Sequence, residues 1–320
     1  MSKLLVTGYS GFVGRNLLNA LGSLDNVSLL GRSIAPICND HLSANIDPSS
    51  DYSSLLKSVE VVIHIAARVH VMNDSVSDPL EEYREVNTRG TINLARQAAA
   101  AGVKRFVFVS SIKVNGEGTS KDKPFTSADL HAPEDDYGLS KSEAEQQLFE
   151  IGKETGMEIV VIRPTLVYGP GVKANFASLM NLVSKGIPLP FGCFKNNKRS
   201  LVSVDNLVDL IVTCIDHPNA ANQVFLVSDD HDLSTSSMVR HMAQVLGKPT
   251  WQLPVPVWCY KLAGKVFNKS DVVDRLTGSL QVDISHTKET LGWVPPQSLQ
   301  EGFKQTAEAF LQSKKSSGKA

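Results

Sequence analysis

A serine, a tyrosine and a lysine in the middle of the chain have the types and spacing needed to move a proton. Tyr137 and Lys141 are four residues apart in a predicted helix, so both side chains lie on one face. An unperturbed phenol has a pKa of about 10, and a nearby ammonium lowers it, which would let Tyr137 act as a base closer to neutral pH. Ser111 follows a predicted strand, from where it can hydrogen-bond the substrate oxygen that exchanges the proton. The Tyr and Lys alone would also fit an ordinary helix face.

A glycine-rich loop at the start of the chain has the spacing of a dinucleotide-binding turn. Gly8, Gly11 and Gly14 are three residues apart and connect the first predicted strand to the first predicted helix. The first allows a tight turn, the second lets the backbone approach a pyrophosphate, and the third lets the helix pack on the sheet. The amide groups and positive dipole end of that helix would face the phosphates. The residues expected to bind the dinucleotide here are Gly8, Ser10, Gly11, Phe12, Val13 and Gly14.

The residues after the second and third predicted strands bear on which dinucleotide is bound. An acidic residue after the second strand would bind the adenosine ribose and favour NAD, but the strand ends in Gly31 and Arg32. Arg32 can pair with a 2′-phosphate, which favours NADP, or it can be a solvated surface cation. Asp47 can accept a hydrogen bond from the adenine amino group, or it can cap the following helix. The expected cofactor is NAD or NADP, with Arg32 favouring NADP.

The elements that must position these residues alternate between short apolar strands and amphipathic helices. Predicted strands span residues 3–7, 27–30, 43–46, 59–65, 104–109 and 158–162, and predicted helices span 11–21, 79–101 and 135–155. Strands that alternate with helices of this length form βαβ units with right-handed crossovers. The sequence therefore predicts an α/β fold, a Rossmann doubly wound parallel sheet with a smaller C-terminal substrate-binding domain.

The second half of the chain departs from this alternation after Pro164. The predicted division assigns residues 1–165 to an NAD(P)-binding Rossmann domain, with 200–230 returning to it. Residues 166–199 and 231–312 are assigned to the substrate-binding domain, which would lie over the carboxyl ends of the strands. Residues 313–320, rich in Lys, Ser and Gly, are predicted to form a flexible tail.

Composition and charge argue against several other classes of protein. The chain has 320 residues, 42% hydrophobic and 20% charged, as is ordinary for a globular protein. Its net charge of -1 does not indicate a nucleic acid or a membrane as partner. The four cysteines lack disulfide or metal-ligand spacing, which predicts free thiols in the cytoplasm and no metal site. For the apolar stretch at 251–267, interrupted by prolines and lysines, a packed helix is favoured over a membrane-surface helix.

These motifs together resemble the extended short-chain dehydrogenase/reductase superfamily, over nearly the whole chain. The segments that carry the resemblance are 7–14, 64–67, 87–91, 110–111, 137–141 and 163–164. The resemblance implies that Ser111 and Tyr137 handle the proton, while Lys141 binds the nicotinamide ribose and tunes Tyr137. It also implies that His64 is structural and that Asn87, grouped with the cofactor-binding residues, anchors its helix. The residues that it places along the cofactor are Ala66, Ala67 and Pro164.

Within that superfamily, the chain looks similar to enzymes of nucleotide sugars, in particular to a UDP-hexose 4-epimerase-like subgroup. Segments 66–72, 110–116, 163–171, 198–207, 278–283 and 291–295 carry this similarity. It implies that Arg199 binds the substrate diphosphate, and that Asn175 and Arg275 bind substrate together with Ser111 and Tyr137. Two arginines suit a diphosphate, because each guanidinium can form paired hydrogen bonds to phosphate oxygens. A surface ion pair stays open as the alternative for either arginine.

Two positions depart from the pattern of well-known 4-epimerases. Asn115 stands where a Tyr is usual before Gly116, and Arg32 follows Gly31 where an acidic residue is usual. The second departure bears on the reaction, because an epimerase recycles a tightly held NAD whereas a 4-ketoreductase consumes NADPH.

Three functions remain in view. The preferred one is a UDP-hexose 4-epimerase that acts at C4 of a UDP-hexose or UDP-hexosamine. The first alternative is an NADPH-dependent 4-ketoreductase of a UDP-4-keto-6-deoxy-hexosamine, and the second is a non-catalytic dinucleotide sensor, which would not need the three proton-transfer residues. The expected partners are a UDP-sugar and a second copy of the chain, in a homodimer formed through helices at 80–101 and 143–156.

Overall fold

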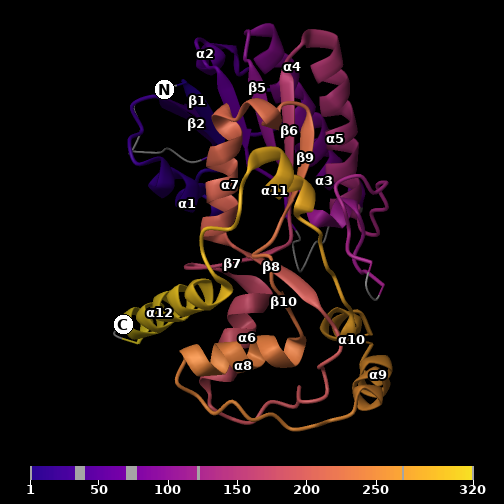
Figure 1. Ribbon diagram of the computed structural model, residues 1–320. Helices are drawn as coiled ribbons and strands as arrows, with labels where there is room; N and C mark the ends of the chain where they lie inside the picture. Colours follow the sequence, from indigo (N-terminus) through magenta and orange to yellow (C-terminus); the bar gives the residue numbers. More distant parts are fainter. Residues whose placement is uncertain (1, 33–39, 70–77, 121–122, 269, 319–320) are drawn as a thin grey trace.

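A seven-stranded parallel sheet forms the upper lobe of the molecule (Figure 1). The computed structural model describes residues 2–32, 40–69, 78–120, 123–268 and 270–318. In spatial order the strands are β3 (His41–Ser43), β2 (Val27–Gly31), β1 (Leu4–Thr7), β4 (Val61–His64), β5 (Arg105–Val109), β6 (Glu158–Pro164) and β9 (Gln223–Val227). The order turns back between β1 and β4, which is the switch point where doubly wound sheets bind ligands. The predicted Rossmann fold is therefore confirmed.

Helices cover both faces of this sheet and enclose two apolar cores. α1 (Phe12–Leu21) and α7 (Val204–Asp216) pack on one face, together with residues from α11 (Ser285–Leu291). α2 (Ser53–Leu56), α4 (Thr91–Ala100) and α5 (Asp136–Thr155) pack on the other face. Because the sheet is buried on both sides, its central strands are nearly continuous runs of apolar residues rather than alternating patterns.

The helix predicted at 79–101 contains a π-helical segment. α3 (Pro79–Tyr83) leads into η1 (Arg84–Gly90), which is π-helical, and α4 follows without a break. Gly90 lies where this helix meets the chain after β3, since a Cβ there would be 2.8 Å from the carbonyl carbon of Ile46. The helix therefore approaches the strand end more closely than any side chain at residue 90 would allow.

The predicted third strand is displaced from its position in the structure. The sequence pattern placed it at 43–46, whereas β3 spans His41–Ser43. Its pairing begins at His41 with Leu29 of β2 and ends at Ser43 with Gly31, the last residue of that strand. Residues after Ser43 have no strand left to pair with, so the partner strand, and not local propensity, sets where β3 ends.

A smaller lobe lies below the sheet in Figure 1 and has its own core. Its three-stranded sheet has the order β10 (Asp232–Leu233), β8 (Arg199–Ser203) and β7 (Leu166–Tyr168). The helices of this lobe are α6 (Ala174–Ser184), α8 (Thr235–Val245), α9 (Val257–Val266), α10 (Ser270–Thr277) and α12 (Leu299–Ser317). Within the predicted return at 200–230, β8 thus pairs in the smaller sheet, whereas α7, the short η3 (Pro218–Ala220) and β9 belong to the upper lobe.

The C-terminal helix is longer than the sequence indicated. α12 continues to Ser317, so the predicted tail at 313–320 begins inside a helix. Lys314 holds this end by donating a hydrogen bond to Ser184 at 2.9 Å and by lying over the Phe310 ring. No helix among the described residues is both long and apolar enough to cross a membrane.

The packing of α1 against β1 makes a first prediction. A Cβ at Gly14 would lie 2.2 Å from the Gly8 carbonyl oxygen, which is backbone and has little room to move. Gly14→Ala is therefore expected to lower the free energy of unfolding by about 1–3 kcal/mol, measured by chemical denaturation. Gly118→Ala is the matched control, since its Cβ would meet nothing nearer than 3.6 Å. Equal stability of the two variants would contradict the packing described.

Candidate active site

Several predicted cofactor-binding and proton-transfer residues lie at one edge of the parallel sheet. Parallel strands all end at the same side, so the residues that follow β1, β4, β5 and β6 are neighbours there (Figure 1). These are Gly8 after β1, Ala66 after β4 and Ser111 after β5, with Pro164 as the last residue of β6. Pro164 is buried and lies beside Val227 of β9.

The loop between β1 and α1 is shaped for an anion. Gly8 has a φ of 70°, and a Cβ there would lie 2.6 Å from the Ala66 amide nitrogen. Gly11 is the N-cap of α1, which has no side-chain cap and no acidic residue in its first turn. Its amide groups and positive dipole end therefore suit a phosphate. The other predicted residues in this loop and first turn are Ser10, Phe12 and Val13. The residues present fit a dinucleotide pyrophosphate.

The segment after β4 is held in place by side chains from two other elements. The Ala66 amide donates to Thr7 Oγ1 at 3.1 Å. Asn87, in η1, accepts a hydrogen bond from the Arg68 amide at 2.8 Å and donates to the Arg68 carbonyl at 3.0 Å. Ala67 lies between these two anchored residues. Asn87 thus fixes the backbone that is predicted to lie along the cofactor.

Ser111, Tyr137 and Lys141 come together where α5 begins beside the end of β5. Ser111 is the N-cap of the short 3-10 helix η2 (Ile112–Val114), and it forms a side-chain hydrogen bond with Tyr137. Lys141 is buried, and its Nζ donates to the Val109 carbonyl at 3.0 Å. The Tyr137 ring meets the Tyr83 ring edge-on, with 6.1 Å between the centroids.

Burial controls the proton affinity of both groups on α5. It raises the pKa of Tyr137, as do Asp135 and Tyr83, and the hydrogen bond with Ser111 opposes them. It lowers the pKa of Lys141 to about 7, against a raising effect of Glu145. The expected lowering of the pKa of Tyr137 depended on Lys141 together with a positive nicotinamide ring, and in the chain by itself desolvation raises this pKa because it disfavours the phenolate. The predicted proton uptake by Tyr137 would therefore require further positive charge at the site.

His64 has no free ring nitrogen for chemistry. Its Nδ1 is 2.7 Å from Thr7 Oγ1 and its Nε2 is 2.9 Å from Thr91 Oγ1. The ring stacks on Phe108, and burial lowers the pKa of His64 to about 3. A neutral imidazole that joins β1, β4 and α4 is a structural residue.

A buried ion pair that the sequence analysis did not identify lies beside Ser111. Glu145 and Arg163 are both buried, and Arg163 Nη2 is 2.5 Å from Glu145 Oε2. Ser110 Oγ donates to the other carboxylate oxygen, Oε1, at 2.5 Å. One carboxylate therefore joins α5 to the ends of β5 and β6. The sequence signal that could have identified Glu145 is its spacing. It lies four residues after Lys141, one turn along the same helix face.

The remaining donors of Arg163 explain one departure from the 4-epimerase pattern. Arg163 Nη1 donates to Asn115 Oδ1 at 2.9 Å, and the Asn115 amide donates to the Thr126 carbonyl at 3.2 Å. Arg163 Nη2 also donates to His131 Nε2 at 2.6 Å, so the proton of this ring is on Nδ1, next to Ser142 Oγ. Asn115 supplies both the acceptor and the donor that this buried position needs.

Arg32 and Asp47 lie at the same edge of the sheet, near β2 and β3. Arg32 directly follows β2 and is exposed. The Asp47 carboxylate accepts four hydrogen bonds from the amides and hydroxyls of Ser49 and Ser50. It therefore caps the turn that follows it, and not helix α2, whose N-cap Tyr52 makes no side-chain capping bond.

The predicted diphosphate-binding residues all lie in the smaller lobe. Arg199 begins β8, is half-buried, and donates from Nη1 to the Gly278 carbonyl at 3.4 Å. Asn175 belongs to α6 and Arg275 to α10, and the side chains of both lie outside the part of the structure that is described.

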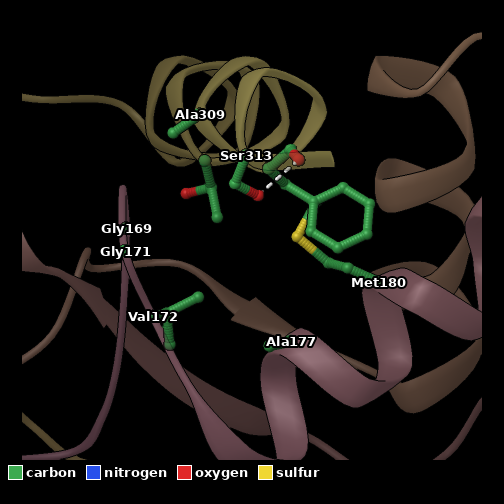
Figure 2. Close-up of a pocket in the computed structure, with 9 residues that line it drawn as sticks. Gly169, Gly171, Val172, Ala177, Met180, Ala309 and Ser313 are labelled. Atoms are coloured by element: carbon green, nitrogen blue, oxygen red, sulfur yellow. Dashed lines mark hydrogen bonds between the residues drawn. The ribbon is translucent and has the colours of Figure 1, made fainter. Parts of the chain in front are cut away.

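A small cavity in the smaller lobe is not the substrate site (Figure 2). It lies between α12, α6 and the loop after β7, and its volume is about 80 Å³. Sites for drug-sized ligands have volumes of roughly 300–1,000 Å³, so a nucleotide sugar would not fit. The residues labelled around it are Gly169, Gly171, Val172, Ala177, Met180, Ala309 and Ser313.

The buried network gives a second prediction. Asn115→Leu would leave a donor of Arg163 buried without an acceptor, and is expected to lower the free energy of unfolding by about 1–3 kcal/mol. Asn26→Leu, at an exposed position, is the matched control and is expected to change it by less than about 0.5 kcal/mol. Chemical denaturation of both variants checks this. Full stability of Asn115→Leu would show that the network tolerates an unpaired guanidinium nitrogen.

Comparisons with known proteins agree with this geometry. The model of the NAD dependent epimerase/dehydratase family matches residues 4–228. The chain is 66% identical over 315 residues to the UDP-glucose 4-epimerase of Vibrio cholerae, an alignment that covers 97% of this chain and 96% of that protein.

Solved structures share the fold. UDP-glucose 4-epimerase from Thermotoga maritima, crystallised with UDP-glucose, has a TM-score of 0.75 at 23% identity and covers 97% of this chain and 99% of its own. MoeE5 in complex with UDP-glucose and NAD has a TM-score of 0.77 at 23% identity. The alignment covers 98% of this chain and 99% of the MoeE5 chain. The matched range spans the glycine loop, the three predicted proton-transfer residues and all seven strands of the main sheet. The chain belongs to the NAD dependent epimerase/dehydratase family.

Proposed function

We propose that the chain is a UDP-hexose 4-epimerase, which interconverts the two C4 epimers of a UDP-linked hexose. The observation that carries the proposal is the placement of Ser111, Tyr137 and Lys141 beside the dinucleotide loop, in a chain 66% identical to a UDP-glucose 4-epimerase. NAD bound at the glycine loop would accept hydride from C4 and return it to the opposite face.

The chain's own residues handle the proton of the C4 hydroxyl. Tyr137 takes this proton as C4 becomes a carbonyl and gives it back when the alcohol re-forms, while Ser111 hydrogen-bonds the same oxygen. In the chain alone, burial raises the pKa of Tyr137, which favours its protonated form. Release of the transferred proton would therefore depend on the charges near the phenol. Oxidation of the C4 alcohol and its re-formation use the same proton transfer in opposite directions, so one set of residues serves both steps.

The alternatives are less well supported. A one-way 4-ketoreductase would use the same proton-transfer residues, but the high identity to an epimerase favours the reversible reaction. A dinucleotide sensor would not need a buried lysine beside a tyrosine and a serine at the sheet edge, and all three are present.

NAD is the cofactor supported by the family and by NAD-bound structures of the same fold. Arg32 adds a finer proposal, that the site also accepts NADP. The residue is exposed and directly follows β2, where a 2′-phosphate on the adenosine ribose would need a cation.

The smaller lobe is proposed to bind the UDP-sugar. Arg199 would hold the diphosphate, with Asn175 and Arg275 as the further contacts. The proposed domain division follows from this, with the upper lobe for the cofactor and residues 166–199 and 231–312 for the substrate.

A homodimer in the cytoplasm remains a prediction, but the structure changes which kind of contact would join the two copies. The exposed residues of the helices at 80–101 and 143–156 are mainly polar, and these helices show no second apolar face. Arg96 on one helix and Glu154 on the other form an ion pair at 3.7 Å. A dimer through these helices would therefore be joined by polar contacts. The described cysteines, Cys193, Cys214 and Cys259, are free thiols, as a reducing compartment would keep them.

Loss of the Tyr137 hydroxyl tests the proposed function. Tyr137→Phe is expected to lower kcat for conversion of UDP-glucose to UDP-galactose by about 10²-fold or more, because the substitution removes the hydroxyl proposed to exchange the proton. Tyr260→Phe is the control, expected to stay close to the wild type, because its hydroxyl contacts the Pro190 carbonyl in the smaller lobe and not Tyr137. The assay uses NAD without added NADPH, so that turnover itself separates an epimerase from a reductase. Wild-type rates in Tyr137→Phe would remove this residue from the mechanism.

Replacement of Arg32 tests the cofactor proposal. Arg32→Ala is expected to weaken NADP binding by about tenfold or more and to leave NAD binding unchanged, since only NADP carries the 2′-phosphate. Arg96→Ala, which removes another exposed arginine, should change neither. Fluorescence titration of both cofactors measures the effect, and an unaltered NADP affinity in Arg32→Ala would refute the assignment.

A further inference from the structure

Helix α9 of the smaller lobe exposes a row of large apolar side chains. Its inner side packs through Val257 and Tyr260, which contact the lobe's core, and the Tyr260 hydroxyl donates to the Pro190 carbonyl. The outer side carries Trp258, Leu262 and Val266, which are 66%, 57% and 70% exposed, and Phe267, 73% exposed, follows the helix end. We call these last four residues the apolar stripe. Spacing of four residues places the three helical members in one line.

Cations border this stripe. Lys261 and Lys265 are exposed and lie three residues after Trp258 and Leu262, so each is beside a member of the stripe. Residues 233–270 contain five Lys and Arg and no Asp or Glu, although the whole chain has a net charge of -1. Within α9, Lys261 and Lys265 are therefore the only charged residues, and both are positive.

We propose that α9 docks on the surface of an anionic lipid membrane. The apolar stripe would enter the boundary between headgroups and acyl chains, while Lys261 and Lys265 contact lipid phosphates. Tryptophan suits this depth, because its ring is apolar and its N–H stays in contact with polar groups. A helix of 10 residues is too short to span a bilayer, which takes about 20, so it would lie in the plane of the surface.

Charge favours lipid over a second copy of the chain. In a symmetric dimer the same patch faces itself, so the patch with Lys261 and Lys265 would be opposed by a second patch with the same two cations. α9 itself carries no carboxylate to pair with them, and the nearest acidic residues along the chain, Asp271 and Asp274, belong to α10. An anionic lipid surface supplies the missing negative charge and accepts the apolar side chains at the same time.

The proposed docking surface is connected to the candidate diphosphate site. α10 packs on α9 and ends at Thr277, directly before Gly278, whose carbonyl accepts a hydrogen bond from Arg199 (Figure 1). Membrane contact through α9 would thus hold the substrate-binding lobe close to the lipid surface. The inference stands on this surface alone and does not depend on the reaction proposed above.

Vesicle flotation tests the proposal. The full chain is expected to float with phosphatidylglycerol vesicles, and binding should weaken with phosphatidylcholine vesicles or in about 0.5 M NaCl, which screens the lysines. Leu262→Glu is expected to weaken binding more than about tenfold, because it removes one apolar anchor and adds a repelled charge. Leu130→Glu is the matched control, since Leu130 is 89% exposed but lies outside the stripe, and it should bind like the wild type.

A second pair of variants isolates the electrostatic part. Replacing Lys261 and Lys265 together by Ala should weaken binding about tenfold or more, whereas the same change at the exposed Lys304 and Lys315 of α12 should have no effect. Circular dichroism and Tm confirm that each variant is folded. Absence of binding by the wild type, or equal binding by Leu262→Glu and Leu130→Glu, would overturn the proposal. So would a wild-type dimer that Leu262→Glu dissolves, because the stripe would then belong to a second copy.

Discussion

The buried carboxylate of Glu145 is the contact on which the arrangement of the active site depends. A charge without water costs several kcal/mol unless it is paired, so this carboxylate must keep Arg163 and Ser110 within hydrogen-bond distance. These partners come from the ends of β6 and β5, whereas Glu145 comes from α5. The ion pair therefore fixes the relative positions of the three elements that carry Tyr137, Ser111 and Pro164. The geometry of the site and the stability of the fold are set by the same contact.

The same carboxylate acts on the chemistry through Lys141, one turn before it. Burial lowers the pKa of Lys141 to about 7, although the negative charge of Glu145 raises it. Without this charge, the buried lysine would lose its proton at lower pH and could not support a phenolate. Tyr137 has no comparable counter-charge in the chain, and burial raises its pKa. For the proposed proton transfer, Tyr137 would therefore need positive charge beyond what the chain supplies.

Local sequence patterns were enough to predict the parts of the fold that depend on local chemistry. The apolar runs of β1, β4 and β5 predicted a buried parallel sheet, and the spacing of Gly8, Gly11 and Gly14 predicted the turn into α1. The end of β3 was not predictable in this way, because the length of β2 sets it. The pairing of Glu145 with Arg163 joins separate elements, and the direction of the Tyr137 pKa follows from burial. Both require the tertiary structure.

Net charge is an average that hides where charges act. At physiological ionic strength, exposed charges influence each other over roughly 8 Å, so a surface responds to its own neighbours and not to the total. The chain's net charge of -1 therefore says little about α9, whose charged residues, Lys261 and Lys265, are both cations. It says equally little about the glycine loop, where backbone amides and a helix dipole would hold an anion with no side-chain charge at all. Both proposed anion sites would therefore depend on local groups, backbone amides at the glycine loop and cations beside apolar side chains at α9.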